Sequence, residues 1–175
     1  RTMEGNQFDQ IYHEHFCYFS FLAAERIFAH HGLALVDVEE VPTHGGSLRI
    51  FARHVEEAAP VSMRVGAMRA AERAAGLERM ATYAAFAEKV VETKCAVLDF
   101  LIAARRGGKT VAGYGAPGKG NTLLNYCGVT RDLFAFTVDR NPYKQGRFLP
   151  GSRIPIHAPE RIAEARPDYV VIMPW

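Results

Sequence analysis

The 175-residue sequence predicts an α/β fold in which a Rossmann-like domain with a parallel sheet forms the carboxyl-terminal part. Three observations support this prediction. A short apolar run, Thr110–Tyr114, ends in a glycine-rich loop that leads into a helix-like segment. After it, apolar strands and short helical segments alternate, as in parallel sheets covered by helices. Before it lie one helix, two antiparallel strands and a long helical segment, predicted from periodicity.

The amino-terminal segment concentrates aromatic and titratable side chains between Phe8 and Phe21. Burying such a mixture is costly unless the polar groups are used. A helix is predicted next, with Ser20 as its N-cap and Gly32 as its C-cap. The histidines in its last turn, His30 and His31, suit the negative end of the helix dipole, and we interpret them as structural.

Two alternating segments, Leu33–Val41 and Ser47–Phe51, predict an antiparallel strand pair with one buried face. The connection between them contains His44 followed by two glycines. Two interpretations remain open for His44: it lines a site, or it belongs to a turn that needs the glycines.

Helix signals then continue from Val61 to Arg106. An unbroken helix of this length would extend roughly 65 to 70 Å at 1.5 Å per residue, too long for such a domain. We therefore expect breaks or bends at Gly66 and Gly76. The helix is expected to end at Arg106, before Gly107 and Gly108.

The glycine-rich loop carries Gly113, Gly115 and Gly118 in the spacing G-x-G-x-x-G. These gaps permit a tight turn, close approach to a phosphate and close helix packing. The first N–H groups of the following helix and Lys119 would face an anion. The spacing also nearly fits an ATP-binding P-loop, but Gly120 stands where that motif needs Ser or Thr, so ATP hydrolysis is rejected. The alternative is a strand–helix turn that needs glycines only for its geometry.

The next predicted strand, Phe134–Asp139, ends in an acid where dinucleotide folds hold a ribose hydroxyl. The following loop is basic, and it either covers a diphosphate or is simply solvated. Three further elements are predicted: an edge strand at Ile154–Ile156, a short helix at Pro159–Ala165 and a buried strand at Tyr169–Met173.

Composition limits the classes of function. The chain is 49% hydrophobic and 23% charged, with a net charge of +2 spread along its length, so no nucleic-acid partner is expected. No apolar segment is long enough to span a bilayer, and no membrane partner is expected. Cys17, Cys95 and Cys127 are widely spaced, which favours reduced thiols and a cytoplasmic location. Because the first residue is not Met, we expect a piece of a longer polypeptide.

The cluster Tyr12-His13-Glu14-His15 is the strongest candidate for chemistry. Acid–base catalysis is one hypothesis, because an oriented histidine can remove a proton beside a carbonyl. Metal binding by His13, His15 and Cys17 is a second, weakened by the lack of a further ligand and of H-E-x-x-H. The third is that the histidine is structural and makes its hydrogen bonds within the core.

Four ordered motifs carry a resemblance to a known family. They are Tyr12–His15, His44–Phe51, Gly113–Asn125 and the segment from Asp139 to Gly151. Together they resemble the C-terminal portion of S-adenosylmethionine-dependent sugar C-methyltransferases, which act on nucleotide-linked 4-keto-deoxysugars. The resemblance implies three parts: residues 1–59 end the catalytic methyltransferase domain, 60–108 form a helical connector, and 109–175 form the nucleotide-sugar-binding domain. It also implies that S-adenosylmethionine is bound mainly upstream, and zinc only in an upstream domain.

The resemblance assigns His15 as the base that removes the C3 proton next to the ketone, with Tyr12 and Glu14 positioning His15 and the sugar. No metal is needed at this step. The residues predicted to bind the nucleotide-diphosphate sugar are His44, Gly115, Gly118, Lys119, Asn121, Asp139, Lys144 and Arg147.

Three functional hypotheses follow. The first is the substrate-binding and base-supplying part of a C-methyltransferase. Because the chain lacks the glycine motif that binds S-adenosylmethionine, we expect it to be inactive alone. The second is a non-catalytic nucleotide-binding module, and the third is a fragment of an NAD-dependent oxidoreductase.

Overall fold

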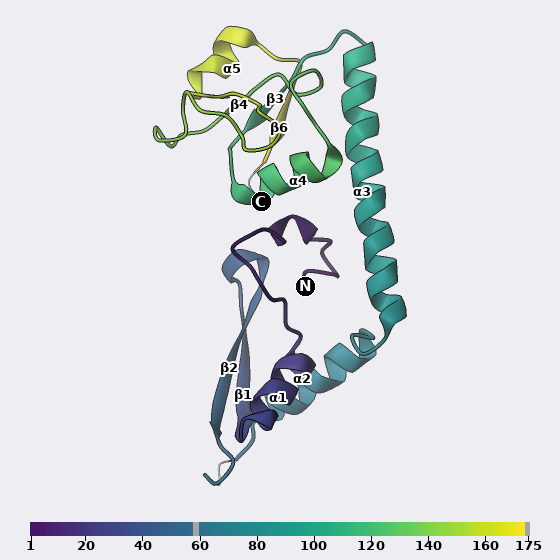
Figure 1. The fold of residues 1–175 in the computed structure, drawn as a ribbon, viewed down its shortest axis with the longest axis vertical. Coiled ribbons are helices and arrows are strands. Elements are labelled where there is room, and N and C mark those ends of the chain that lie inside the picture. Colours follow the sequence, from purple (N-terminus) through teal and green to yellow (C-terminus); the bar gives the residue numbers. More distant parts are fainter. Residues whose placement is uncertain (58–59, 174–175) are drawn as a thin grey trace. The chain divides into compact units, whose positions relative to one another are not determined.

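The computed structural model describes residues 1–57 and 60–173 and contains two compact units (Figure 1). The first unit joins Arg1–Asn6 with Cys17–Ala87, and the second joins Gln7–Phe16 with Glu88–Trp175. None of the helices in the described part of the chain is both long and apolar enough to cross a membrane.

The first unit contains an antiparallel strand pair packed against helices, as predicted, but the second strand continues past Phe51 to His54 and none of its residues is fully buried. Its elements are α1 (Phe21–His30), β1 (Leu33–Val41), the 3-10 turn η2 (Thr43–Gly45), β2 (Ser47–His54), α2 (Met63–Ala74) and the start of α3 (Met80–Arg106). The register shifts between Leu35 and Asp37. Because of this shift, the buried Leu35 and Val38 lie three residues apart and still face one core with Phe21 and Val65.

The predicted N-cap of α1 is confirmed, whereas its C-cap is His31, one residue before the predicted Gly32. The Ser20 hydroxyl accepts a hydrogen bond from the Ala23 N–H, and Gly32 adopts a φ of +70°. Glu72 on α2 adds a second cap that sequence reasoning missed. Its carboxylate accepts hydrogen bonds from the N–H groups of Phe21 and Leu22, at 2.7 and 2.9 Å.

The long helical signal divides into α2 and α3, and the predicted break at Gly76 is confirmed by its φ of +75°. The predicted break at Gly66 is wrong, because α2 runs through that position without interruption. Val65 beside it is fully buried in the core. That packing outweighs the penalty of about 1 kcal/mol for a glycine inside a helix. The end of α3 at Arg106 agrees with the prediction.

The second unit contains the predicted parallel sheet. Its strands are β3 (Val111–Tyr114), β4 (Thr137–Val138), β5 (Ile156–His157) and β6 (Tyr169–Ile172), in the order β5-β4-β3-β6 with all neighbours parallel. The unit also contains η1 (Phe8–Gln10), α4 (Gly118–Cys127) and α5 (Glu160–Ala165).

Three strand predictions need correction. β4 is shorter than Phe134–Asp139, and β5 begins at Ile156 and not at Ile154. β6 is largely exposed, although a buried strand was predicted. The reason is its place at the edge of the sheet, where only β3 pairs with it.

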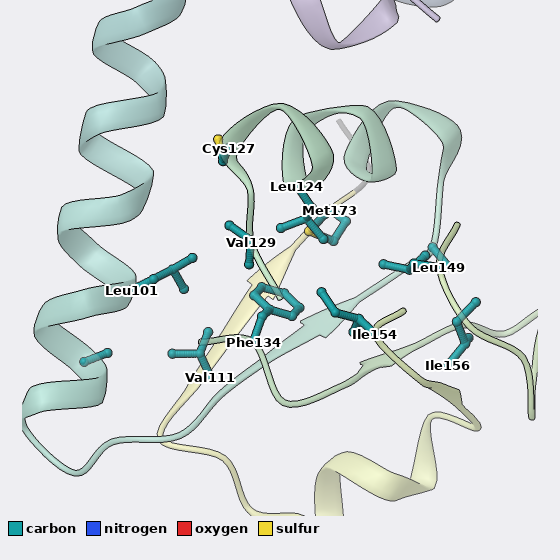
Figure 2. Close-up of a cluster of buried hydrophobic side chains, with 12 residues drawn as sticks. Leu101, Val111, Leu124, Cys127, Val129, Phe134, Leu149, Ile154, Ile156 and Met173 are labelled. Carbon is teal, nitrogen blue, oxygen red and sulfur yellow. The ribbon is translucent and has the colours of Figure 1, made fainter. Parts of the chain in front are cut away.

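The core of the second unit lies between the sheet, α3 and α4, as Figure 2 shows. Phe134 is at its centre and is 1% exposed. Apolar side chains from α3, β3, α4 and the adjoining loops belong to the same core: Leu101, Val111, Leu124, Val129, Ile154 and Met173. This core fixes β3 and α4, the two elements that flank the glycine-rich loop.

Asp168, which precedes β6, joins the starts of two parallel strands. Its carboxylate accepts hydrogen bonds from Lys109 Nζ at 2.8 Å and from the N–H and hydroxyl of Thr110 at 2.9 and 3.0 Å. These contacts, the Lys109 hydrogen bond above all, lower the pKa of Asp168 to about 2.

We therefore predict a specific acid sensitivity. A carboxyl whose pKa is depressed on folding stabilises the protein above its unfolded pKa of about 3.9 and loses that contribution as the pH falls through the folded value. Asp168→Asn should reduce the loss of stability between pH 5 and pH 2, measured by urea denaturation at each pH. The hydrogen bond with Arg64 lowers the pKa of Asp37 to about 2 as well. The variant therefore keeps part of the dependence of stability on pH. Equal slopes for variant and parent would contradict the prediction.

Candidate functional site

The glycine-rich loop links β3 to α4, and its glycines have different roles. Gly115 adopts a φ of +95°, which favours glycine. A methyl group added at Gly113 would lie 2.7 Å from Thr137 Oγ1 and 2.8 Å from the Phe134 ring, so close packing requires this glycine. At Gly118 the nearest atom to an added methyl group is Tyr12 Cζ, at 4.0 Å. In contrast to Gly113, Gly118 therefore leaves space beside the chain.

The first turn of α4 presents backbone donors. Its N-cap, Pro117, has no side-chain acceptor for the first N–H groups of the helix. The first intrahelical hydrogen bond runs from the Asn121 N–H to the Pro117 carbonyl. Within residues 1–57 and 60–173, the N–H groups of Gly118 and Gly120 have no acceptor. Together with the positive end of the helix dipole and the half-buried Lys119, these groups suit an anion.

The segment with the predicted base packs on α4, within the same unit. The Phe8 ring of η1 meets the Tyr126 ring edge-on, with centroids 5.2 Å apart. Further along, the Tyr12 ring lies beside Gly118 and 4.5 Å from the His15 ring, centroid to centroid. Tyr12 therefore lies between His15 and the start of α4. Nothing in the local sequence indicated this packing.

The environment of His15 fixes its tautomer. Nδ1 lies 2.9 Å from the Gln10 carbonyl oxygen. A carbonyl oxygen only accepts hydrogen bonds, so Nδ1 carries the proton and Nε2 carries the lone pair of the neutral ring. Glu14 lies near the other histidine, with Oε1 4.0 Å from His13 Nε2.

Two predicted binding residues, Asp139 and Lys144, contact the loop itself. Asp139 Oδ2 accepts hydrogen bonds from the Ala116 N–H at 2.7 Å and from Lys144 Nζ at 3.3 Å. Lys144 Nζ also donates to the Ala116 carbonyl at 2.8 Å. Burial raises the pKa of Asp139, but the Asn141 and Ala116 N–H groups and Lys144 together lower it below its usual range. The carboxylate is therefore charged at neutral pH.

Comparison with known proteins identifies the family. The model of the C-methyltransferase C-terminal domain matches residues 42–175. The chain belongs to the C-methyltransferase C-terminal domain family. It is also 42% identical, over 173 residues, to C-methyltransferase NovU of Streptomyces niveus, an alignment that covers 99% of this chain and 41% of NovU. The chain thus spans about two-fifths of the length of that relative, and the predicted family is confirmed.

The remaining predicted residues of this C-methyltransferase C-terminal domain occupy different environments. Asn121 is half-buried on α4, and its Oδ1 is buried without a hydrogen-bond partner in the described part of the chain. Arg147 is exposed on the loop before β5. His44 belongs to the first unit, where it is exposed with a φ of +55°.

One residue of the site was missed from the sequence. Thr137 on β4 is fully buried, and its hydroxyl donates to the Gly115 carbonyl at 2.7 Å. The available signal was its position two residues before Asp139, because alternate residues of a strand lie on the same side. No group of three or more His, Cys, Asp and Glu side chains among the described residues could hold a metal ion.

Proposed function

We propose that this chain provides the substrate-binding residues and the catalytic base of an S-adenosylmethionine-dependent C-methyltransferase. Its substrate would be a nucleotide-linked keto-deoxysugar, methylated at the carbon next to the ketone. The packing of the Tyr12–His15 segment against the start of α4 is the observation that carries this proposal. The histidine and the start of α4, where we propose that the diphosphate binds, belong to one compact unit. The family and the identity to NovU support transfer of a methyl group to carbon.

In this proposal His15 Nε2 removes the proton from the carbon beside the ketone, which the carbonyl makes acidic. The Tyr12 hydroxyl donates a hydrogen bond to the ketone oxygen and stabilises the developing enolate. Glu14 would help to position His15 and the sugar. The Gln10 carbonyl keeps the His15 ring in the tautomer that has its lone pair on Nε2.

The methyl donor, S-adenosylmethionine, supplies an electrophilic methyl group when bound. Residues of the glycine-rich loop do not fit its adenosine, because the carboxylate that could hold the ribose, Asp139, accepts hydrogen bonds from this chain through both oxygens. The same observation argues against NAD. We therefore propose that the methyl donor is bound mainly by residues outside this chain, with zinc only in an upstream domain.

The nucleotide diphosphate would lie at the start of α4, near Gly118, Lys119 and Asn121, with Gly115 shaping the loop. Arg147 remains a proposed contact to the nucleotide sugar. We also propose that residues 1–59 complete the catalytic domain, 60–108 connect the domains and 109–175 bind the nucleotide sugar. The three cysteines are free thiols, which fits the reducing cytoplasm.

Calorimetric titration tests this proposal. TDP or UDP should bind the protein, NAD should not, and the 175 residues alone should transfer no methyl group to a TDP-keto-deoxysugar. Binding of NAD without either nucleotide diphosphate would contradict the proposal and favour the oxidoreductase hypothesis.

A further inference from the structure

We infer that Thr137, Asp139 and Lys144 are positioning residues, which form a brace that holds the glycine-rich loop and act on the nucleotide through it. On this account Asp139 does not hold the ribose, the role that its place after β4 suggested. The inference rests on the proposed function and deepens it, because it separates residues that contact the nucleotide from those that orient the contacts.

Each polar backbone group of Gly115 and Ala116 is bonded to β4 or to the segment that follows it. The Gly115 N–H donates to the Val138 carbonyl at 2.6 Å, and its carbonyl accepts from the Thr137 hydroxyl at 2.7 Å. The Ala116 N–H donates to Asp139 at 2.7 Å, and its carbonyl accepts from Lys144 at 2.8 Å. These backbone groups therefore already have hydrogen-bond partners within the protein and are not the ones that bind phosphate.

Burial and further hydrogen bonds restrain the brace residues themselves. Thr137 is fully buried, and the Asp139 side chain is 14% exposed. Asp139 Oδ1 accepts from the Asn141 N–H at 2.8 Å, and the Asp139 carbonyl accepts from Gln145 Nε2 at 2.9 Å. Three hydrogen bonds thus occupy most of the acceptor sites of this largely buried carboxylate, so a ribose hydroxyl would compete with these donors. Hydrogen bonds to a charged group are about twice as strong as neutral ones, so displacement is unfavourable.

The braced residues lead directly into α4. Ala116 is followed by the N-cap, Pro117, and then by the first turn that presents the Gly118 and Gly120 N–H groups. The direction of this turn depends on the conformation of the two residues before it. Loosening the brace should therefore weaken binding of any ligand that carries the diphosphate, whatever its sugar.

Three ligands that differ only in ribose hydroxyls test the inference: thymidine diphosphate, ribothymidine diphosphate and 3′-deoxythymidine diphosphate. Asp139→Asn and Lys144→Met should each lower the affinity for all three by about tenfold, and by the same factor within about twofold, because charged hydrogen bonds are lost at the loop and not at the sugar. Without ligand, hydrogen exchange of the Ala116 amide should accelerate by about tenfold. Asp132→Asn, beyond the far end of α4, is the matched control and should change neither quantity.

A loss confined to ligands with one particular hydroxyl would overturn the inference and assign Asp139 to the ribose. Unchanged exchange at Ala116 would also overturn it, even with weaker binding, because Lys144 would then contact the phosphates directly. If Asp139→Asn does not fold, Lys144→Met carries the test alone. If the parent protein binds none of the three nucleotides, the proposed function fails, while the exchange of Ala116 still decides whether the brace exists.

Discussion

Replacement of His15 by alanine, in a full-length C-methyltransferase that contains this chain, is expected to lower the rate of methyl transfer by about 10²- to 10⁴-fold, the usual contribution of a general base. Binding of the nucleotide sugar should remain within about threefold, because the proposed diphosphate contacts are at the start of α4 and do not include the imidazole. Single-turnover transfer of a labelled methyl group measures the first effect, and calorimetry measures the second.

His13→Ala is the matched control, since His13 is exposed and its ring centroid lies 6.1 Å from that of Tyr12, against 4.5 Å for His15. This variant should keep the parental rate within about threefold, as expected for an exposed side chain. Near-normal turnover of the His15 variant, or equal losses in both variants, would remove His15 as the base.

Replacement of Gly113 by alanine is expected to destabilise the second unit. The added methyl group would lie 2.7 Å from Thr137 Oγ1 and 2.8 Å from the Phe134 ring, and both residues are almost fully buried. Overpacking of this kind costs about 1–3 kcal/mol. Urea denaturation should show this loss in the free energy of unfolding.

Gly118→Ala is the matched control for that loss. Its methyl group would have no neighbour closer than Tyr12 Cζ at 4.0 Å. Folding stability should stay the same or rise by about 0.4–1 kcal/mol, because alanine restricts the unfolded chain. Affinity for TDP should nevertheless fall, since the methyl group occupies the space beside the proposed diphosphate site. Equal destabilisation by the two substitutions would contradict the assigned roles of these glycines.

Local signals in the sequence were sufficient for much of the fold. Ser20 and Gly32 define the ends of α1, and Gly76 separates α2 from α3, because caps and left-handed glycines act on their own backbone. The order of strands and helices after Thr110 likewise predicted the parallel sheet.

Features that depend on distant partners could not be predicted in this way. Gly66 stays helical because Val65 packs in the core, and β6 is exposed because β3 is its only neighbour in the sheet. For the site, the residue types indicated His15 and the start of α4 as candidates. The packing of Phe8 on Tyr126 and the hydrogen bond from the Ala116 N–H to Asp139 join segments more than 20 residues apart, and no local pattern encodes them.

The central claim is that the imidazole of His15 and the start of α4 bind opposite ends of one ligand. Titration of the isotope-labelled protein with a TDP-linked keto-deoxysugar, followed by NMR, tests it directly. The His15 ring signals and the Gly118 and Gly120 amide signals should shift together with one dissociation constant, while His30 and His31 on α1 stay unchanged. Saturation of the α4 amides with no change at His15 would contradict the account.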